Sequence, residues 1–199
     1  MTNALIHGFG ERPPRVSPNA LAGQIVMLDE PIHLESHQPG WAAEFRHEQN
    51  RIAASLGVSP SAIEHIGSTA VSGLLAKPII DIMIGAEHVP PPDEWSDALA
   101  GLGYDALGEA GVPGRWYFCL RTAPFRNAHI VEQGGTHWVH NLAFRNYLRQ
   151  SPEAARRYES AKRAAVAAGA TTLVAYSGAK RSIVEDLLAE ALKSESRGI

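Results

Sequence analysis

The sequence of 199 residues contains only one cysteine, Cys119. A single cysteine excludes an intrachain disulfide framework and a zinc site built from several thiolates. The sequence also has no apolar run that approaches the roughly 18 residues needed to cross a membrane, and its first residues show no apolar leader segment. We therefore expect a cytoplasmic protein with no membrane partner, in a reducing compartment.

Neither sign of charge dominates the chain. The formal net charge is −3, so there is no strong nucleic-acid signal, because proteins that bind nucleic acids usually carry a basic field. A local basic cluster is compatible with this total, which leaves small anionic ligands open. Because 45% of the residues are hydrophobic, a chain of this length can bury a core without disulfides or a structural metal.

The pattern of apolar residues predicts an N-terminal extension followed by one domain. Residues 1–30 mix glycine, proline and polar residues, which predicts a partly flexible extension with a short strand at 24–28. Within 31–199, apolar periodicity and β-branched runs predict both helices and strands. The predicted helices cover 41–56, 93–101, 136–149, 152–169 and 175–193, and the predicted strands cover 62–66, 79–84, 104–107, 115–121 and 127–132. Strands in the middle with helices at both ends indicate an α+β fold.

One stretch, residues 64–84, combines residue types that suit phosphate and metal binding. A strand ends in Gly67 and Ser68, and Ser68 or Thr69 can cap a short helix that we expect to run to about residue 75. Glycine lets the backbone approach a phosphate closely, and a hydroxyl with helix-start amides can bind its oxygens. The next strand carries Asp81 among isoleucines, where a carboxylate is costly unless it is paired or holds a metal such as Mg²⁺.

Each part of this stretch also has an ordinary structural explanation. A glycine-serine pair is most often only a turn, and a single strand aspartate such as Asp81 is often a surface residue or an ion-pair partner. Lys77 beside a proline fits a solvated loop charge as well as a phosphate contact. The combination of strand, Gly-Ser turn and acidic apolar strand favours a phosphate or metal site more than its parts do.

The run HIGSTAVSGLLAKPIIDIMI at 65–84 closely resembles the signature of the GrpB family, which is also found fused to bacterial dephospho-CoA kinases. The resemblance extends over roughly residues 31–190. Its other motifs are Pro31-Ile32, Pro39-Gly40-Trp41, Phe45, Glu48, Gly103-Tyr104, residues 108–115, Phe118, residues 141–149, Ser151-Pro152-Glu153, Tyr158, Lys162, Tyr176 and Lys180.

The resemblance implies a nucleotidyltransferase-like fold, a mixed β-sheet flanked by helices. In active members of that superfamily, Gly-Ser precedes two carboxylates separated by one residue, and a third follows on a later strand; together they hold two Mg²⁺ ions. Asp81 matches the first carboxylate, but Met83 stands at the second and cannot bind a hard cation. Glu109 or Glu64 is a candidate for a further acidic ligand. A structural carboxylate that pairs with Arg115 or a backbone amide is the favoured alternative for each.

The histidines are less specific. Relatives typically show His-x-His on the strand that matches 127–132, and here Asn127 stands at the first position and His129 at the second. His129 is a candidate general base or phosphate contact, and a hydrogen-bonded histidine inside the sheet is the alternative. His137 and His140 lie three residues apart on a predicted helix, a spacing that suits zinc, but no third ligand is specified.

The resemblance assigns polyphosphate contacts to Arg115, Arg145 and Lys180. Arg145 and Arg149 are four residues apart on a predicted helix, compatible with a phosphate clamp and also with a solvated helix face. We interpret three further arginines as solvated charge: Arg156, Arg157 and Arg163.

These observations lead to one leading hypothesis and two alternatives. The leading hypothesis is a protein that binds a nucleotide in a cleft, with phosphate at Gly67, Ser68 and Thr69 and Mg²⁺ on Asp81, and transfers a nucleotidyl group. The first alternative is a non-catalytic module that binds a nucleotide or a CoA-like metabolite, suggested by Met83. The second is a partner-binding scaffold, suggested by the fusions of the relatives.

Overall fold

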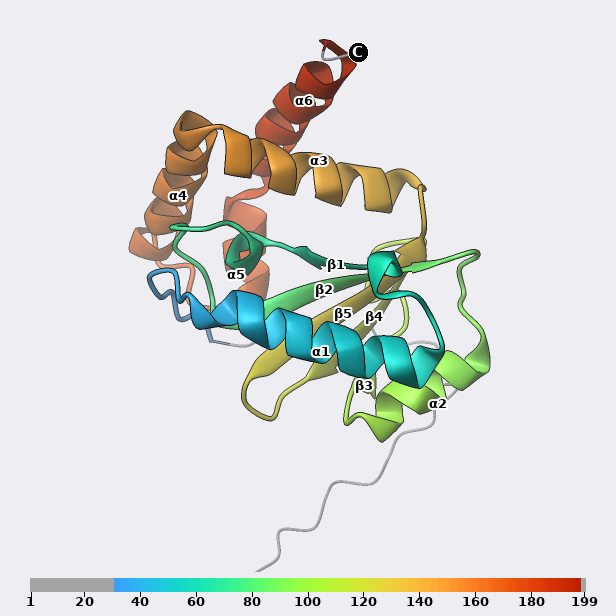
Figure 1. Cartoon of the computed structure of the whole chain (residues 1–199). Coiled ribbons are helices and arrows are strands. Elements are labelled where there is room, and N and C mark those ends of the chain that lie inside the picture. The colour runs from blue at the N-terminus through green and yellow to red at the C-terminus, as the bar shows by residue number, and fades with distance from the viewer. Residues whose placement is uncertain (1–30, 198–199) are drawn as a thin grey trace, which may run out of the picture.

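The computed structural model describes residues 31–197, in which a five-stranded sheet carries helices on both faces (Figure 1). The strands are β1 Ile63–Ile66, β2 Ile79–Ala86, β3 Asp105–Ala106, β4 Arg115–Leu120 and β5 Phe125–Glu132. They are ordered β1-β2-β5-β4-β3, with β2 parallel to β5 and every other neighbouring pair antiparallel. This mixed sheet confirms the predicted α+β class. The predicted extension at 1–30, with its strand at 24–28, lies outside the described residues.

The helices mostly begin and end where local signals predict. The α-helices are α1 Gly40–Leu56, α2 Asp93–Gly101, α3 Thr136–Gln150, α4 Pro152–Ala167, α5 Leu173–Ala179 and α6 Arg181–Arg197, and the 3₁₀ helices are η2 Pro60–Ala62 and η3 Ser68–Ala70. Gly57 ends α1 in the left-handed conformation. Ser151 caps α4 by accepting a hydrogen bond from the amide of Ala154. None of the helices between residues 31 and 197 is long and apolar enough to span a membrane.

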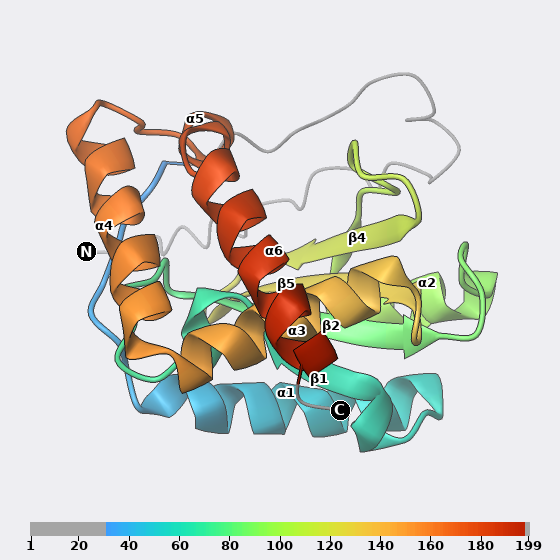
Figure 2. The same cartoon turned by 90° about the horizontal axis from the view of Figure 1, so that it is seen from above.

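The two faces of β2 have different neighbours. Ile80, Ile82 and Ile84 lie in the main core with residues of α1, among them Trp41. Met83 points to the opposite face, where it packs in a cluster with Trp138 of α3. Figures 1 and 2 show this arrangement, with α1 and α2 on one side of the sheet and α3 and α6 on the other. Because side chains alternate along a strand, Asp81 lies on the same face as Met83.

Two predicted helices differ from the structure. The helix predicted at 175–193 is divided into α5 and α6 at Lys180, whose side chain turns toward tyrosines of α4 and α5. The helix predicted from Ser68 to about residue 75 is only the short η3, and no side chain caps it. Neither of the two hydroxyls predicted to cap a helix does so: Ser68 accepts from Lys162, and Thr69 donates to the carbonyl of Ile79.

A buried carboxylate on α1 links the helix to the sheet. Glu48 is completely buried, accepts a hydrogen bond from the hydroxyl of Tyr104 at 3.0 Å and pairs with Arg51 at 2.7 Å. Its Oε2 also lies 3.4 Å from Nε of Arg126 on β5. A buried charge of this kind is tolerated because several donors surround it.

Candidate functional site

The Gly67-Ser68 turn brings the backbone against the carboxylate of Asp81. Gly67 follows β1 with φ of 70°, a conformation that residues with a Cβ rarely adopt. A Cβ placed on Gly67 would lie 2.5 Å from Oδ2 of Asp81. The close approach and the backbone angle therefore both require glycine here. The turn and the strand aspartate are therefore adjacent through Gly67.

Asp81 is held by a chain of hydrogen bonds on the face of the sheet that α3 and α6 cover. Asn127 of β5 donates from Nδ2 to Oδ1 of Asp81 at 2.7 Å. The side-chain Oδ1 of Asn127 accepts from the hydroxyl of Tyr117 at 2.8 Å and from Nη2 of Arg121 at 3.0 Å. These two donors fix the orientation of the amide, so Asn127 presents its NH₂ group to the carboxylate. His129 adds Nε2 at 3.7 Å from the same Oδ1.

These contacts keep Asp81 ionised. Burial raises the pKa of the carboxyl group, but His129, Lys77 and Asn127 outweigh it and lower the pKa to about 2. The side chain of Asp81 is 27% exposed and that of His129 15% exposed. The site therefore presents an ionised carboxylate that is partly exposed to solvent.

Arg115 lies near this carboxylate with an unsatisfied donor. Its guanidinium is 5.0 Å from the ring centroid of Tyr117, and Nη2 donates to the carbonyls of Glu109 and Ala110. Its Nε is buried and has no hydrogen-bond partner among the described residues. Burial lowers the pKa of Arg115, while Tyr117 and Asp81 favour its charged form. A buried donor without a partner is costly, and an anionic ligand would satisfy it.

A two-metal centre does not fit the residues present. Met83 is fully buried against Trp138 and its neighbours. Glu109 is exposed, and its carboxylate accepts a hydrogen bond from the amide of Gly114 at 2.8 Å. Between residues 31 and 197 there is no group of three or more His, Cys, Asp or Glu side chains that could hold a metal. A single Mg²⁺ does fit, because this ion is often bound by one carboxylate together with substrate phosphates and water.

On the other side of the turn, Ser68 meets a buried lysine of α4. Lys162 is 1% exposed; its Nζ donates to Oγ of Ser68 at 3.3 Å and to the carbonyl of Leu75. Nζ of Lys180 donates to the hydroxyl of Tyr158 at 3.3 Å. Nζ of Lys162 lies 4.6 Å from the ring centroid of Tyr158. Lys162 of α4 and Lys180, between α5 and α6, therefore converge on one tyrosine beside the serine turn.

The pKa of Lys162 reflects this crowding. Burial lowers it to about 7, and the neighbouring charge of Lys180 acts in the same direction. A bound anion would favour the charged form of both amines. The sequence named Lys162 only through the family resemblance, because nothing in its helix pattern separates it from a surface lysine. Its contact with Ser68, which is 94 positions away, exists only in the folded chain.

Thr69 and His65 face the opposite side of the turn. Thr69 is buried, its hydroxyl donates to the carbonyl of Ile79, and Nε2 of His65 lies 3.0 Å from the same hydroxyl. The ring of His65 stacks on Phe45 at a centroid distance of 4.6 Å. Burial lowers the pKa of His65 to about 4. The hydroxyl of Thr69, predicted to contact phosphate, is thus engaged within the protein.

The predicted arginine clamp of α3 lies along β1 and the turn. Nη1 of Arg145 pairs with Oε2 of Glu64 at 2.6 Å and donates to the carbonyl of His65. Arg149 donates twice to the carbonyl of Ala70, at 2.9 and 2.8 Å. These contacts attach α3 to β1 and to η3. They satisfy an outward carbonyl of β1, which is an edge strand.

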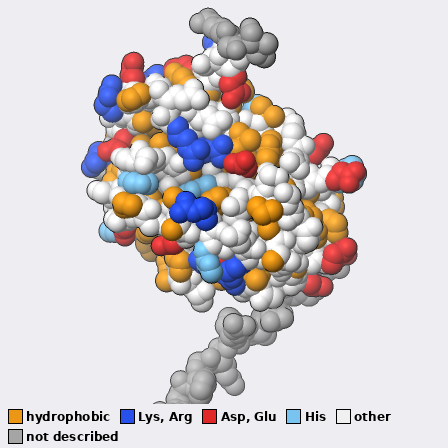
Figure 3. Space-filling model, viewed as in Figure 1, with side chains coloured by type: hydrophobic (Ala, Val, Ile, Leu, Met, Phe, Trp, Pro, Cys, Tyr) orange, Lys and Arg blue, Asp and Glu red, His pale blue; other side chains and the backbone are white. Residues whose placement is uncertain are grey.

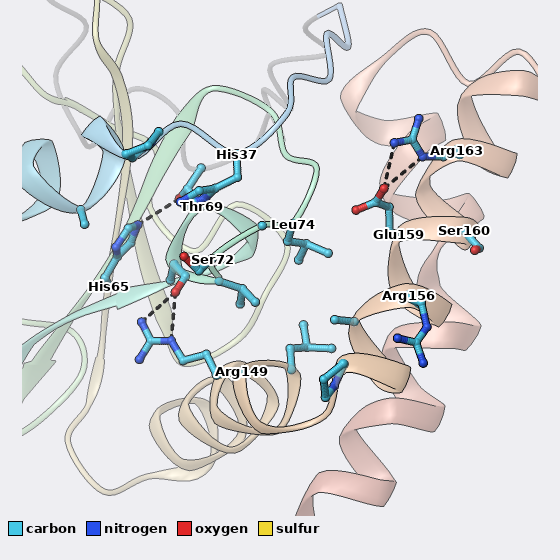
Figure 4. A pocket seen from close by; sticks show the side chains of 18 residues that line it. His37, His65, Thr69, Ser72, Leu74, Arg149, Arg156, Glu159, Ser160 and Arg163 are labelled. Atoms are coloured by element: carbon cyan, nitrogen blue, oxygen red, sulfur yellow. Dashed lines mark hydrogen bonds and ion pairs between the residues drawn. The ribbon is translucent and has the colours of Figure 1, made fainter.

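A cavity lies on this second side of the turn. It has a volume of about 960 Å³ and is lined by residues that include Thr69 and Arg149 (Figure 4). Neither Ser68 nor Asp81 is among its lining residues. The hydrogen-bond geometry, and not the cavity size, is what marks Ser68 and Asp81 as a site.

Comparison with known proteins gives consistent matches. The family model described as GrpB protein matches residues 31–190. A UPF0157 protein of Pseudomonas aeruginosa is 35% identical over 173 residues, which are 82% of this chain and 69% of that protein. The crystal structure of conserved protein GrpB from Enterococcus faecalis superimposes with a TM-score of 0.73 at 31% identity, covering 82% of this chain and 99% of that one. A dephospho-CoA kinase of Mycolicibacterium paratuberculosis is 28% identical over 161 residues, 68% of this chain and 40% of that protein.

Proposed function

The chain belongs to the GrpB family, and from the geometry of its serine turn we propose that it binds a nucleotide or a related phosphate-bearing metabolite. The observation that carries the proposal is the contact between Ser68 and buried Lys162 in a turn whose glycine lies against Asp81. The turn thus has a cationic group on one side and a carboxylate on the other. Phosphate bound with a divalent cation needs both.

The phosphate end of the ligand would meet Ser68, Lys162 and Lys180. Lys162 is almost fully buried, so its interaction with an anion would be weakly screened by solvent. Lys180 approaches from the junction of α5 and α6, with Nζ 4.6 Å from the ring centroid of Tyr176. The unsatisfied Nε of Arg115 offers a further donor on the side of Asp81.

Asp81 would hold one Mg²⁺, which supplies charge neutralisation to the phosphate oxygens. Asn127 orients the carboxylate by occupying Oδ1. His129 is the candidate general base. In nucleotidyl transfer, an acceptor hydroxyl oxygen would bond to the α-phosphorus while pyrophosphate leaves, and His129 would take the hydroxyl proton.

Binding without turnover is the second candidate function. Met83 favours it, because a buried thioether stands where active nucleotidyltransferases place their second carboxylate. The match to a protein named dephospho-CoA kinase makes CoA-like metabolites reasonable ligands to test.

Calorimetric titration with ATP and Mg²⁺ tests the binding proposal. We expect Lys180→Gln and Ser68→Ala each to raise the Kd about fivefold to twentyfold. Each substitution removes one hydrogen bond to the ligand, which is charge-assisted for Lys180 and neutral for Ser68. Lys193→Gln, which removes an exposed positive charge on α6, should leave affinity within about twofold. If all three substitutions change the affinity equally, the proposed site is ruled out. It is also ruled out if the protein binds none of ATP, ADP, AMP, CoA and dephospho-CoA.

Label transfer from α-labelled nucleotides separates the two functions. An active nucleotidyltransferase should transfer label with Mg²⁺ or Mn²⁺ in the wild type and lose it in Asp81→Asn. Equal transfer by both proteins would exclude Asp81 from the reaction. Nucleotide binding with no transfer in either protein selects the non-catalytic function.

A further inference from the structure

The cavity beside Thr69 forms a second, separate concentration of polar groups, which we call the arginine groove. It lies between the start of α1, the loop that follows η3, and one face of α3 and α4 (Figure 4). Its polar walls come from His37, His65, Thr69, Arg149, Arg156 and Arg163. Figure 3 shows basic and histidine side chains gathered on the face of the molecule between α1 and α3.

The groove carries a local positive charge within an acidic chain. Three arginines and one acidic residue, Glu159, are among its lining residues. Glu159 pairs with Arg163 at 2.8 Å, so its charge is already balanced. Arg156 has no hydrogen bond or ion pair within the described part of the chain. Arg149 is fixed in place by its two bonds to Ala70, which reduces the entropy that a ligand contact would cost.

One end of the groove contains a hydrogen-bonding group without a partner. Nδ1 of His37 is buried and lacks a hydrogen-bond partner among residues 31–197. The ring of His37 packs edge-on against Trp41 with a centroid distance of 5.4 Å. Nearby, Nε2 of His65 and Oγ1 of Thr69 are 3.0 Å apart, and the Thr69 hydroxyl donates to the carbonyl of Ile79. The N–H of a neutral imidazole such as that of His37 can bind a phosphate oxygen without changing the charge of the groove.

The shape and lining of the groove favour a small ligand over a polymer. Its volume of about 960 Å³ falls within the range of roughly 300–1,000 Å³ found for small-molecule sites. No Phe, Tyr or Trp is among the described residues that line it, so single-stranded bases would lack a stacking surface. Small residues such as Ala70, Ser72 and Gly73 are also among its lining residues, which leaves room for phosphate oxygens.

We propose that the arginine groove is a binding site for a small molecule carrying a diphosphate or triphosphate group. The arginines of α3 and α4 bind the phosphate oxygens, and the imidazole of His37 binds the far end of the same group. This site is separate from Ser68 and Asp81, which do not line the groove. The loop after η3 forms the wall between the two: Leu75 donates its amide to Glu159 on the groove side and offers its carbonyl to Lys162.

Titration of the full chain with inorganic tripolyphosphate, without Mg²⁺, tests the proposal. The protein carries Lys180→Gln, which weakens phosphate binding at the other site. Adding Arg156→Gln should raise the Kd for tripolyphosphate about tenfold, as expected for one charge-assisted contact. Lys193→Gln removes a charge outside the groove and should change the Kd less than about twofold. Arg156 is exposed and has no internal partner, so its substitution should not unfold the protein.

A local readout comes from the imidazole resonances in the same titration. The signals of His37 and His65 should shift with the calorimetric Kd, while the signal of His88, on the loop after β2, should stay in place. The proposal is overturned if tripolyphosphate does not bind at millimolar concentration, if Arg156→Gln and Lys193→Gln weaken binding equally, or if the two histidine signals do not move. It is also overturned if single-stranded RNA shifts these signals and tripolyphosphate does not. Asp81→Asn and the nucleotide assays do not enter this test, so it stands or fails independently of the proposed nucleotide site.

Discussion

Gly67 and Asp81 touch so closely that no other residue fits at position 67. A Cβ there would lie 2.5 Å from Oδ2 and 3.1 Å from Cβ of Asp81. We expect Gly67→Ala to displace the carboxylate and to lower the free energy of unfolding by about 2 kcal/mol or more, because steric overlap adds to the cost of a positive φ. Urea denaturation measures this change.

Gly57→Ala is the matched control for this substitution. Gly57 has a similar φ, 68°, but a Cβ there would meet nothing within 4 Å. Its substitution should cost about 1 kcal/mol through the backbone alone, and ligand binding should be unchanged. If both variants lose the same stability, the close contact at Gly67 has no energetic consequence.

Glu48 is expected to be the carboxylate whose loss destabilises the fold most. Glu48→Gln removes the charge that faces Arg51 and buried Arg126. Breaking a buried pair in this way costs about 3 kcal/mol, because a charge is left without its partner. Glu44→Gln, on the same helix with no ion-pair partner among the described residues, should stay within about 0.5 kcal/mol. Thermal unfolding of the two variants compares them directly, and equal melting temperatures would contradict the expectation.

Lys162 should make stability depend on pH above neutrality. Its pKa is lowered to about 7 in the folded chain from 10.5. Between these values the unfolded chain binds a proton that the folded chain has released, so the free energy of unfolding rises with pH. The slope approaches about 1.4 kcal/mol per pH unit for one proton. Lys162→Met should remove this slope between about pH 7.5 and 9.5. If the free energy of unfolding changes with pH equally in the wild type and the variant, Lys162 is charged over the whole of this pH range.

His65 should have the corresponding effect on the acid side. Its pKa is lowered from 6.5 to about 4, chiefly by burial. Between these values the unfolded chain again holds the extra proton, so stability decreases as the pH falls through this window. His65→Gln should flatten the decrease, although the loss of stacking on Phe45 lowers stability at every pH. An NMR titration of the imidazole gives the pKa itself, and a midpoint near 6.5 would contradict the prediction.

Much of the fold could be predicted from local patterns, because helix stripes and caps are encoded by residues close in the chain. The Trp41, Phe45 and Ile52 stripe places α1, and Ser151 with Pro152 starts α4. The strand order could not be predicted in this way. β2 pairs with β5 although β3 and β4 lie between them in the sequence, and no local pattern specifies such a long-range pairing. The break at Lys180 was missed for a similar reason, since its contacts with tyrosines of α4 and α5 are tertiary.

The candidate site was partly predictable. Gly67, Ser68 and Asp81 carry local signals, and the structure places the glycine and the aspartate in contact. Asn127 could not be recognised as the partner of Asp81 without the strand register that aligns the two residues. The pair Arg145 and Arg149 shows the limit of helix spacing as a signal, because a phosphate clamp and a structural attachment to β1 require the same spacing.

If Ser68 and Asp81 serve one phosphate-bearing ligand, both must contact it in the bound state. A crystal structure with Mn²⁺ and a non-hydrolysable ATP analogue, analysed by anomalous scattering, shows whether they do. We expect an Mn²⁺ peak bonded to the carboxylate of Asp81 and to a phosphate oxygen, with the same phosphate chain at Ser68 and Lys180. A nucleotide bound away from the turn, or bound there with no ion on Asp81, would rule out the proposed site.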